Sequence, residues 1–160
     1  LILKRELPPD DARFLALLTD SRIGEALTMN VTEVRARQQE CLTLVKPESL
    51  ISSTTILSAS ETLAKSDRGA ETLSWLTRWI RDLVIILVDG DRDQILHLDQ
   101  VPHLQRFAGR ADIDLLLTLL SDIEKHAQQA TRHLNVQMAI ETTFLRLREA
   151  LGLVPVGATT

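Results

Sequence analysis

The chain has 160 residues, 44% of them apolar, and a formal net charge of −4, so it can bury a hydrophobic core and lacks the basic excess typical of unspecific nucleic-acid binding. Its single cysteine, Cys41, excludes an intramolecular disulfide and a cysteine-based zinc site. No run reaches the roughly 18 apolar residues of a membrane span, and the N-terminus lacks the pattern of a secretion signal, which predicts a cytoplasmic protein without a membrane partner.

The apolar residues are mostly aliphatic, and this composition predicts an all-α fold. Leucine dominates, tyrosine is absent, and the chain holds three Phe and two Trp. Long unbranched side chains lose little conformational freedom in a helix, whereas strands favour β-branched and aromatic residues. The first helix is expected at Pro8 and Pro9, because proline fits a first helical turn and the acidic residues that follow complement the exposed amides.

A short second helix and a longer third helix are expected before Pro47. Ser21 can cap the second helix, and Asn30 or Thr32 can cap the third, since each side chain can accept a hydrogen bond from an exposed amide. Pro47 ends the third helix, because the residue before a proline is pushed out of helical geometry. We therefore expect a small helical unit over residues 1–46.

A polar helix is predicted over residues 48–66, followed by a central helix with the strongest apolar periodicity of the chain. Apolar residues recur there at alternating three- and four-residue steps, the spacing of a buried seam: Leu73, Leu76, Ile80, Leu83 and Leu87. A short helix over residues 101–107 and a long one over 112–133 follow, and Asn135 can cap a last helix that ends at Gly152. The expected total is seven or eight helices and no strand.

Three acidic residues, Asp89, Asp91 and Asp93, imitate the opening of a calcium-binding loop. Such a loop also needs a glycine at its sixth position and a carboxylate at its twelfth, and Gln94 and Gln100 stand at these positions. We interpret the segment as a solvated loop between helices.

The histidines form no recognisable metal site, and no catalytic motif is present. None of them belongs to an HExxH pair, and His126 and His133 share one helix but would need further ligands from elsewhere. Exposed or partly packed side chains are the simpler interpretation for all four: His97, His103, His126 and His133. No glycine-rich phosphate loop and no strand-flanked nucleophile elbow occurs. We expect no catalytic residue, no metal and no cofactor.

Trp75 and Trp79 lie one helical turn apart on the central helix. Exposed indole rings could form a platform for a base or for a partner side chain. The flanking positions are apolar all round, which is typical of an interior helix. We therefore favour a core role for both side chains over a binding platform.

Ten residues in two helical segments carry a resemblance to a known family: Trp75, Leu76, Arg81, Asp82, Asn135, Met138, Glu141, Leu145, Arg146 and Leu147. In order and spacing they resemble the C-terminal collar domain of the bacterial DNA polymerase III clamp-loader delta-prime subunit. The resemblance is strongest over residues 73–82 and 134–147.

This resemblance implies a small lid remnant followed by an orthogonal or up-down helical collar bundle. Residues 1–46 would be the end of a AAA+ lid domain, residues 48–154 the collar, and residues 155–160 a C-terminal tail. The chain begins at Leu1 and not at Met, and we expect it to be a fragment whose nucleotide-fold domain precedes Leu1.

Gly24 indicates a non-catalytic member of the family. ATP-hydrolysing relatives place a sensor arginine where Gly24 stands. Arg22 does not replace that arginine, because two steps along a helix rotate a side chain by roughly 200°. The resemblance therefore implies a subunit that does not hydrolyse ATP itself. The lid stretch that carries this part of the resemblance is Ser21, Ile23, Gly24, Ala26 and Leu27.

Subunits of this family assemble side by side through their collars and load the sliding clamp on DNA during replication. The resemblance thus implies delta and tau/gamma subunits as partners, with DNA contacted only through the whole complex. Such a domain presents apolar surface to its neighbours. The residues that we expect at this subunit interface are Trp75, Trp79, Phe144 and Leu151.

Three alternatives stay open. The collar of a tau/gamma-type ATPase would keep the sensor arginine, and Gly24 argues against it. An unrelated helical DNA-binding or regulatory protein would read DNA with a short helix, and Glu25 would then bring the wrong charge near the phosphates. A helical enzyme would need a pocket with convergent titratable groups.

Overall fold

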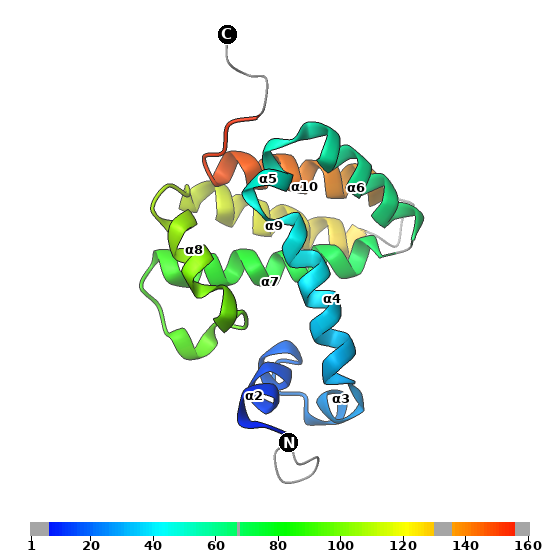
Figure 1. The fold of residues 1–160 in the computed structure, drawn as a ribbon, viewed down its shortest axis with the longest axis vertical. Coiled ribbons are helices and arrows are strands. Elements are labelled where there is room, and N and C mark those ends of the chain that lie inside the picture. Colours follow the sequence, from blue (N-terminus) through cyan, green and yellow to red (C-terminus); the bar gives the residue numbers. More distant parts are fainter. Residues whose placement is uncertain (1–6, 67, 130–135, 156–160) are drawn as a thin grey trace.

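The structure is a computed structural model that describes residues 7–66, 68–129 and 136–155 (Figure 1). In these ranges the chain forms helices and no strand, so the predicted all-α fold is confirmed. None of the described helices is long and apolar enough to cross a lipid bilayer. The α-helices are α2 (Pro9–Leu18), α3 (Ile23–Thr28), α4 (Val31–Leu44), α5 (Pro47–Ile51), α6 (Ser53–Lys65), α7 (Gly69–Leu87), α8 (Val101–Ala108), α9 (Ile113–Gln129) and α10 (Val136–Ala150), and the two 3₁₀ turns are η1 (Arg92–Gln94) and η2 (Leu98–Gln100).

The long helix α7 is the element around which the others are arranged. Helices α4, α6, α8, α9 and α10 all contact it, and α10 also packs against α5, α6 and α9. In Figure 1, α4 leads from this bundle to the short helices α2 and α3, which lie together near the N-terminus. The chain thus consists of a small N-terminal helical group joined to a larger bundle.

The main core lies inside the bundle and contains the apolar seam of α7. Leu76, Ile80 and Leu83 are each at most 1% exposed and belong to one cluster with Phe144 and Leu147 of α10. Full burial of such a side chain contributes about 1.5–3 kcal/mol. The predicted seam of the central helix is therefore a major source of stability, as its spacing indicated.

A second core joins the N-terminal helices to α7. Phe14 of α2 stacks on Trp75 of α7 with ring centroids 6.5 Å apart, and Leu96, from the segment after η1, belongs to the same cluster. Arg13 reaches the same segment, since its guanidinium donates hydrogen bonds of 2.9 Å to the carbonyl oxygens of Asp93 and Ile95. The N-terminal helices are thus packed on the bundle and not merely tethered to it.

The number of helices differs from the prediction because the helix expected over residues 48–66 is two helices. The described residues hold nine α-helices in place of seven or eight. The break lies at Ser52, whose backbone is extended with φ −94° and ψ 107°, and whose hydroxyl accepts a hydrogen bond of 3.2 Å from the amide of Thr55. A serine that can cap a new helix ends the preceding one when its backbone leaves helical geometry.

Two of the predicted caps can be compared with the structure. Asn30 caps α4, because its side-chain oxygen accepts hydrogen bonds from the amides of Thr32 and Glu33, which confirms the first of the two candidates. The expected cap by Ser21 is wrong. Arg22 occupies the cap position of α3, and Ser21 has a positive φ of 63° in the turn before it. Asn135, the expected cap of the last helix, lies outside the described residues.

Pro47 ends one helix and begins the next. Helix α4 stops at Leu44, and Pro47 stands in the first turn of α5, where its missing amide hydrogen costs nothing. The predicted end of the third helix is confirmed. The division into residues 1–46 and 48–154 stays a prediction.

Candidate functional site

One stripe of α7 is left partly uncovered by the rest of the protein. The side chains of this stripe are exposed or half-buried, although α7 is the central helix of the bundle. Their spacing of three and four residues places them on a single helical face, which adjoins the buried seam at Leu73. The stripe, which we call the α7 stripe, consists of Ala70, Leu73, Ser74, Thr77, Arg78 and Arg81.

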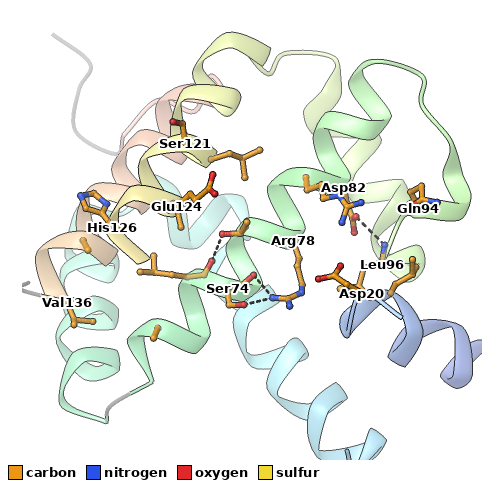
Figure 2. Close-up of a pocket in the computed structure, with 18 residues that line it drawn as sticks. Asp20, Ser74, Arg78, Asp82, Gln94, Leu96, Ser121, Glu124, His126 and Val136 are labelled. Carbon is orange, nitrogen blue, oxygen red and sulfur yellow. Dashed lines mark hydrogen bonds between the residues drawn. The ribbon is translucent and has the colours of Figure 1, made fainter. Parts of the chain in front are cut away.

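The α7 stripe forms the floor of a groove of about 730 Å³ (Figure 2). The end of α2 supplies one wall through Leu17 and Asp20, and α9 supplies the other through Leu120 and Glu124. The start of α10 closes one end of the groove with Val136. Four segments that are distant in the sequence therefore meet around one face of α7.

Arg78 lies at the centre of the groove and is held by its own chain. Its guanidinium donates hydrogen bonds to the carbonyl oxygen of Leu18, at 3.2 Å, and to the carbonyl and hydroxyl oxygens of Ser74. It also lies over the ring of Trp75, 5.9 Å from the ring centroid. Arg78 thus ties the end of α2 to α7 and fixes a positive charge in the floor.

Burial lowers the pKa of Arg78, and the negative charge of Asp20 opposes this shift. A guanidinium remains protonated at neutral pH even when its pKa falls, because its ordinary value is so high. Figure 2 shows Arg78 reaching from α7 toward Asp20. The floor of the groove therefore carries a permanent cation that is already solvated by protein groups.

The rim of the groove carries charges that the described part of the chain does not pair. Arg81 is exposed on α7, Glu124 is exposed on α9, and Asp20 is exposed at the end of α2. No ion pair or side-chain hydrogen bond within the described residues involves Arg81 or Glu124, whereas the charge of Asp20 interacts with the guanidinium of Arg78. A cationic side chain of the groove floor thus faces solvent together with an anionic one on the α9 wall.

A buried polar cluster lies beside the Arg81 end of the groove floor. Asp82 is 1% exposed, and its carboxylate accepts hydrogen bonds from the backbone amides of Leu96, at 3.2 Å, and His97, at 2.8 Å. The Nδ1 atom of His97 lies 2.6 Å from the same carboxylate. The cluster fastens the segment after η1 to α7, and Leu96 of this segment also lines the groove.

The sequence interpretation missed this cluster. His97 was expected to be exposed or partly packed, but it is 1% exposed and its ring lies edge-on to Trp75, 6.1 Å away between centroids. A signal existed in Asp82, which stands three residues after Trp79 inside a strongly apolar helix. A carboxylate in such a position is kept only with hydrogen-bond partners.

The four residues expected at a subunit interface are all buried within this chain. Trp75 is 7% exposed, Trp79 2%, Phe144 1% and Leu151 0%. The core role that we favoured for the two tryptophans is confirmed, because Trp79 packs edge-on against Phe107 at 5.6 Å and Trp75 stacks on Phe14. Whether any of the four acts at an interface stays a prediction. In the described structure their rings and methyl groups contact their own chain.

The large apolar side chains that do reach the surface are others. They are spread over several helices and the segments between them, and Val136, at the start of α10, lines the groove. Among the described residues, the exposed large apolar side chains are Ile23, Leu57, Val88, Leu98, Leu115, Leu117, Val136, Met138, Leu145 and Val154.

The acidic loop after α7 has a structural role. Asp91 caps the 3₁₀ turn η1, because its carboxylate accepts a hydrogen bond of 2.9 Å from the amide of Asp93. Within the ranges that the structure describes, no three histidine, cysteine or acidic side chains come together as metal ligands. Of the other histidines, His126 lines the groove, His103 is exposed on α8, and His133 lies outside the described residues.

The side chain of Cys41 is buried. Burial raises the pKa of its thiol to about 11, so the thiol is protonated and unreactive at neutral pH.

Gly24 lies in the first turn of α3 on the surface, and a Cβ atom added there would meet no atom within 4 Å. A longer side chain would therefore fit at this position.

The described residues form an all-helical bundle domain with a groove along its central helix. The model of the family described as DNA polymerase III, delta subunit, C terminal, matches residues 32–149 of the chain. The chain therefore belongs to this family of clamp-loader domains. The match begins in α4 and ends in α10, so it covers the whole bundle and leaves α2 and α3 outside. No curated protein and no solved structure matches the chain significantly.

Proposed function

We propose that this chain is the C-terminal part of a delta-prime-type subunit of the clamp loader. In this proposal residues 1–46 end a AAA+ lid, residues 48–154 form the collar that joins the subunit to its neighbours, and residues 155–160 are a tail. The observation that carries the clamp-loader role is the family match, which spans the helices of the bundle. The delta-prime type and the lid over residues 1–46 rest on the resemblance described above. The chain would thus help to load the sliding clamp in the bacterial cytoplasm.

Gly24 supports a delta-prime type over an ATP-hydrolysing tau/gamma type. The resemblance of the lid stretch places Gly24 where those relatives have a sensor arginine. A Cβ atom added at Gly24 would meet no atom within 4 Å, so packing does not demand glycine at this position. We infer that the absence of a cation here reflects a subunit that does not hydrolyse ATP and contacts DNA only as part of the complex.

The test is reconstitution of the complex from purified subunits. The full subunit that contains this chain is mixed with the delta and tau/gamma subunits of the same organism, and the mixture is analysed by sedimentation velocity. We expect one complex that contains all three, because a collar domain acts by binding its neighbours. A control mixture without tau/gamma subunits shows which partner is needed. A full subunit that sediments alone in every mixture would contradict the proposal.

A further inference from the structure

We propose that the groove along α7 receives one amphipathic helix of a neighbouring clamp-loader subunit. That helix would present leucine-type side chains to the groove floor, a carboxylate to Arg81 and a cationic side chain to Glu124. The inference rests on the proposed function and extends it, since it names the contact surface and the chemistry of the element that covers it.

The shape of the groove favours a helix as the occupant. Its floor follows α7 from Ala70 to Arg81, and at 1.5 Å per residue this stretch is about 16 Å long, or three helical turns. The walls come from the end of α2 on one side and α9 on the other (Figure 2). A straight trough between helices is the usual receptor for an amphipathic helix, which inserts residues spaced by three, four and seven positions.

The floor and its surroundings provide apolar surface for such an insertion. Leu73 and Leu120 are half-buried members of the main core whose outer sides line the groove. Val136, at 41% exposure, closes the end, and Leu117, at 48% exposure, continues the apolar face of α9 one turn away from Leu120. These side chains gain from burial when a leucine-type face covers them.

The charges of the rim indicate which charges the incoming helix carries. Arg81 and Glu124 stand on α7 and α9 with no ion pair to any described residue, whereas Arg78 is already bound to Leu18 and Ser74. Unpaired charges of opposite sign, one on the floor and one on the α9 wall, favour a ligand that carries the complementary signs in the same order. An uncharged apolar ligand would leave both rim charges uncompensated.

The inference is tested with two variants of the full subunit, each with a matched control on α8, outside the groove. Arg81→Glu reverses the rim charge, and Ala70→Trp places an indole over the groove floor. Arg106→Glu and Gln105→Trp make the same changes at exposed positions of α8. Circular dichroism melts of all four variants show whether each remains folded.

We expect each groove variant to bind purified delta and tau/gamma subunits about tenfold more weakly than the wild type, and each control to bind normally. Cross-linking at position 74, in a Ser74→Cys variant, should capture a helical segment of one partner. A lysine that replaces the carboxylate of that segment should restore binding to the Arg81→Glu subunit.

The outcomes separate this inference from the proposed function. If the wild type binds the partner subunits and both groove variants bind them equally tightly, the groove assignment is wrong and the proposed function remains intact. Failure of the wild type to bind any subunit would overturn the proposed function. Sedimentation of the wild-type subunit alone as a dimer that Arg81→Glu dissociates would show that a second copy occupies the groove, and so would overturn the assignment to a partner subunit.

Discussion

Asp82 is the buried side chain on which the attachment of the segment after η1 depends. Its carboxylate accepts hydrogen bonds from two backbone amides and also contacts the imidazole of His97, and all of these groups are shielded from water. Buried donors that lose their acceptor keep the full cost of desolvation, about 1–3 kcal/mol each. The residue therefore acts on stability through its neighbours as well as through its own contacts.

We expect Asp82→Ala to lower the free energy of unfolding by about 2–5 kcal/mol, because it leaves several buried donors without an acceptor. Asp82→Asn keeps one acceptor oxygen and should cost less. Urea unfolding followed by circular dichroism measures both changes, with Glu149→Ala as an exposed control. An Asp82→Ala protein as stable as the wild type would show that the cluster contributes nothing to folding.

Gln38 has the opposite energetic character. It is 0% exposed, and neither atom of its side-chain amide has a hydrogen-bond partner among the described residues. The amide lies beside a cavity of about 10 Å³ that Trp75, Trp79 and His97 also line. A buried amide without partners opposes folding.

Replacement of Gln38 by methionine, which has a similar length, should raise the free energy of unfolding by about 1–2 kcal/mol, because it removes the desolvated amide and keeps the volume. Thermal and urea melts of Gln38→Met against the wild type measure the change. Gln39→Met, at the neighbouring exposed position, is the matched control. A destabilised Gln38→Met protein would mean that the amide is well satisfied in solution.

At the scale of elements, α7 and α10 approach each other closely where both begin. A Cβ atom added to Gly69 would lie 2.3 Å from Cγ1 of Val136 and 2.9 Å from Cδ1 of Ile140. A Cβ atom at these distances would force the side chains of Val136 and Ile140 to shift, so glycine at this position permits the close approach of the two helices. The same contact places Val136 at the end of the groove.

We expect Gly69→Ala to destabilise the protein by about 1–3 kcal/mol, because the gain in helix propensity is smaller than the cost of overpacking. The companion variant Val136→Ala removes the clashing methyl group and, combined with Gly69→Ala, should recover most of the loss. A double-mutant cycle of unfolding free energies measures this coupling. Additive effects of the two substitutions would contradict a direct contact.

At the scale of the whole molecule, the two cores are linked by helices that serve both. On α4, Cys41 belongs to the core with Phe14, whereas Leu42 and Val45 at its end belong to the main core. On α7, Trp75 and Leu76 divide in the same way. A boundary at Pro47 is therefore a boundary of helices along the chain, and packing continues across it.

Much of the fold follows from local patterns in the chain. The aliphatic composition and the seam from Leu73 to Leu87 predict an all-helical bundle around one central helix, and Asn30 and Pro47 mark helix ends by their own backbone and side-chain chemistry. The break at Ser52 was missed, because a serine inside a periodic segment fits an exposed helical position as well as a cap.

The candidate site was less accessible to sequence reasoning. The polar spacing from Ser74 to Arg81 can be seen in the chain, but the walls of the groove come from α2, α9 and α10, whose positions depend on tertiary packing. The buried state of Phe144 and Leu151 has the same origin. Periodicity says that a side chain is apolar on a given face and does not say whether its own chain or another subunit covers it.

The amino-acid sequence by itself determined the helical class and the helix carrying the central seam, since these depend on interactions a few residues apart. Only the tertiary structure decided that Asp82 contacts His97, that Val136 packs closely against Gly69, and that one stripe of α7 remains partly uncovered. Each of these depends on the relative placement of helices, which is set by many weak contacts acting together and not by any local pattern.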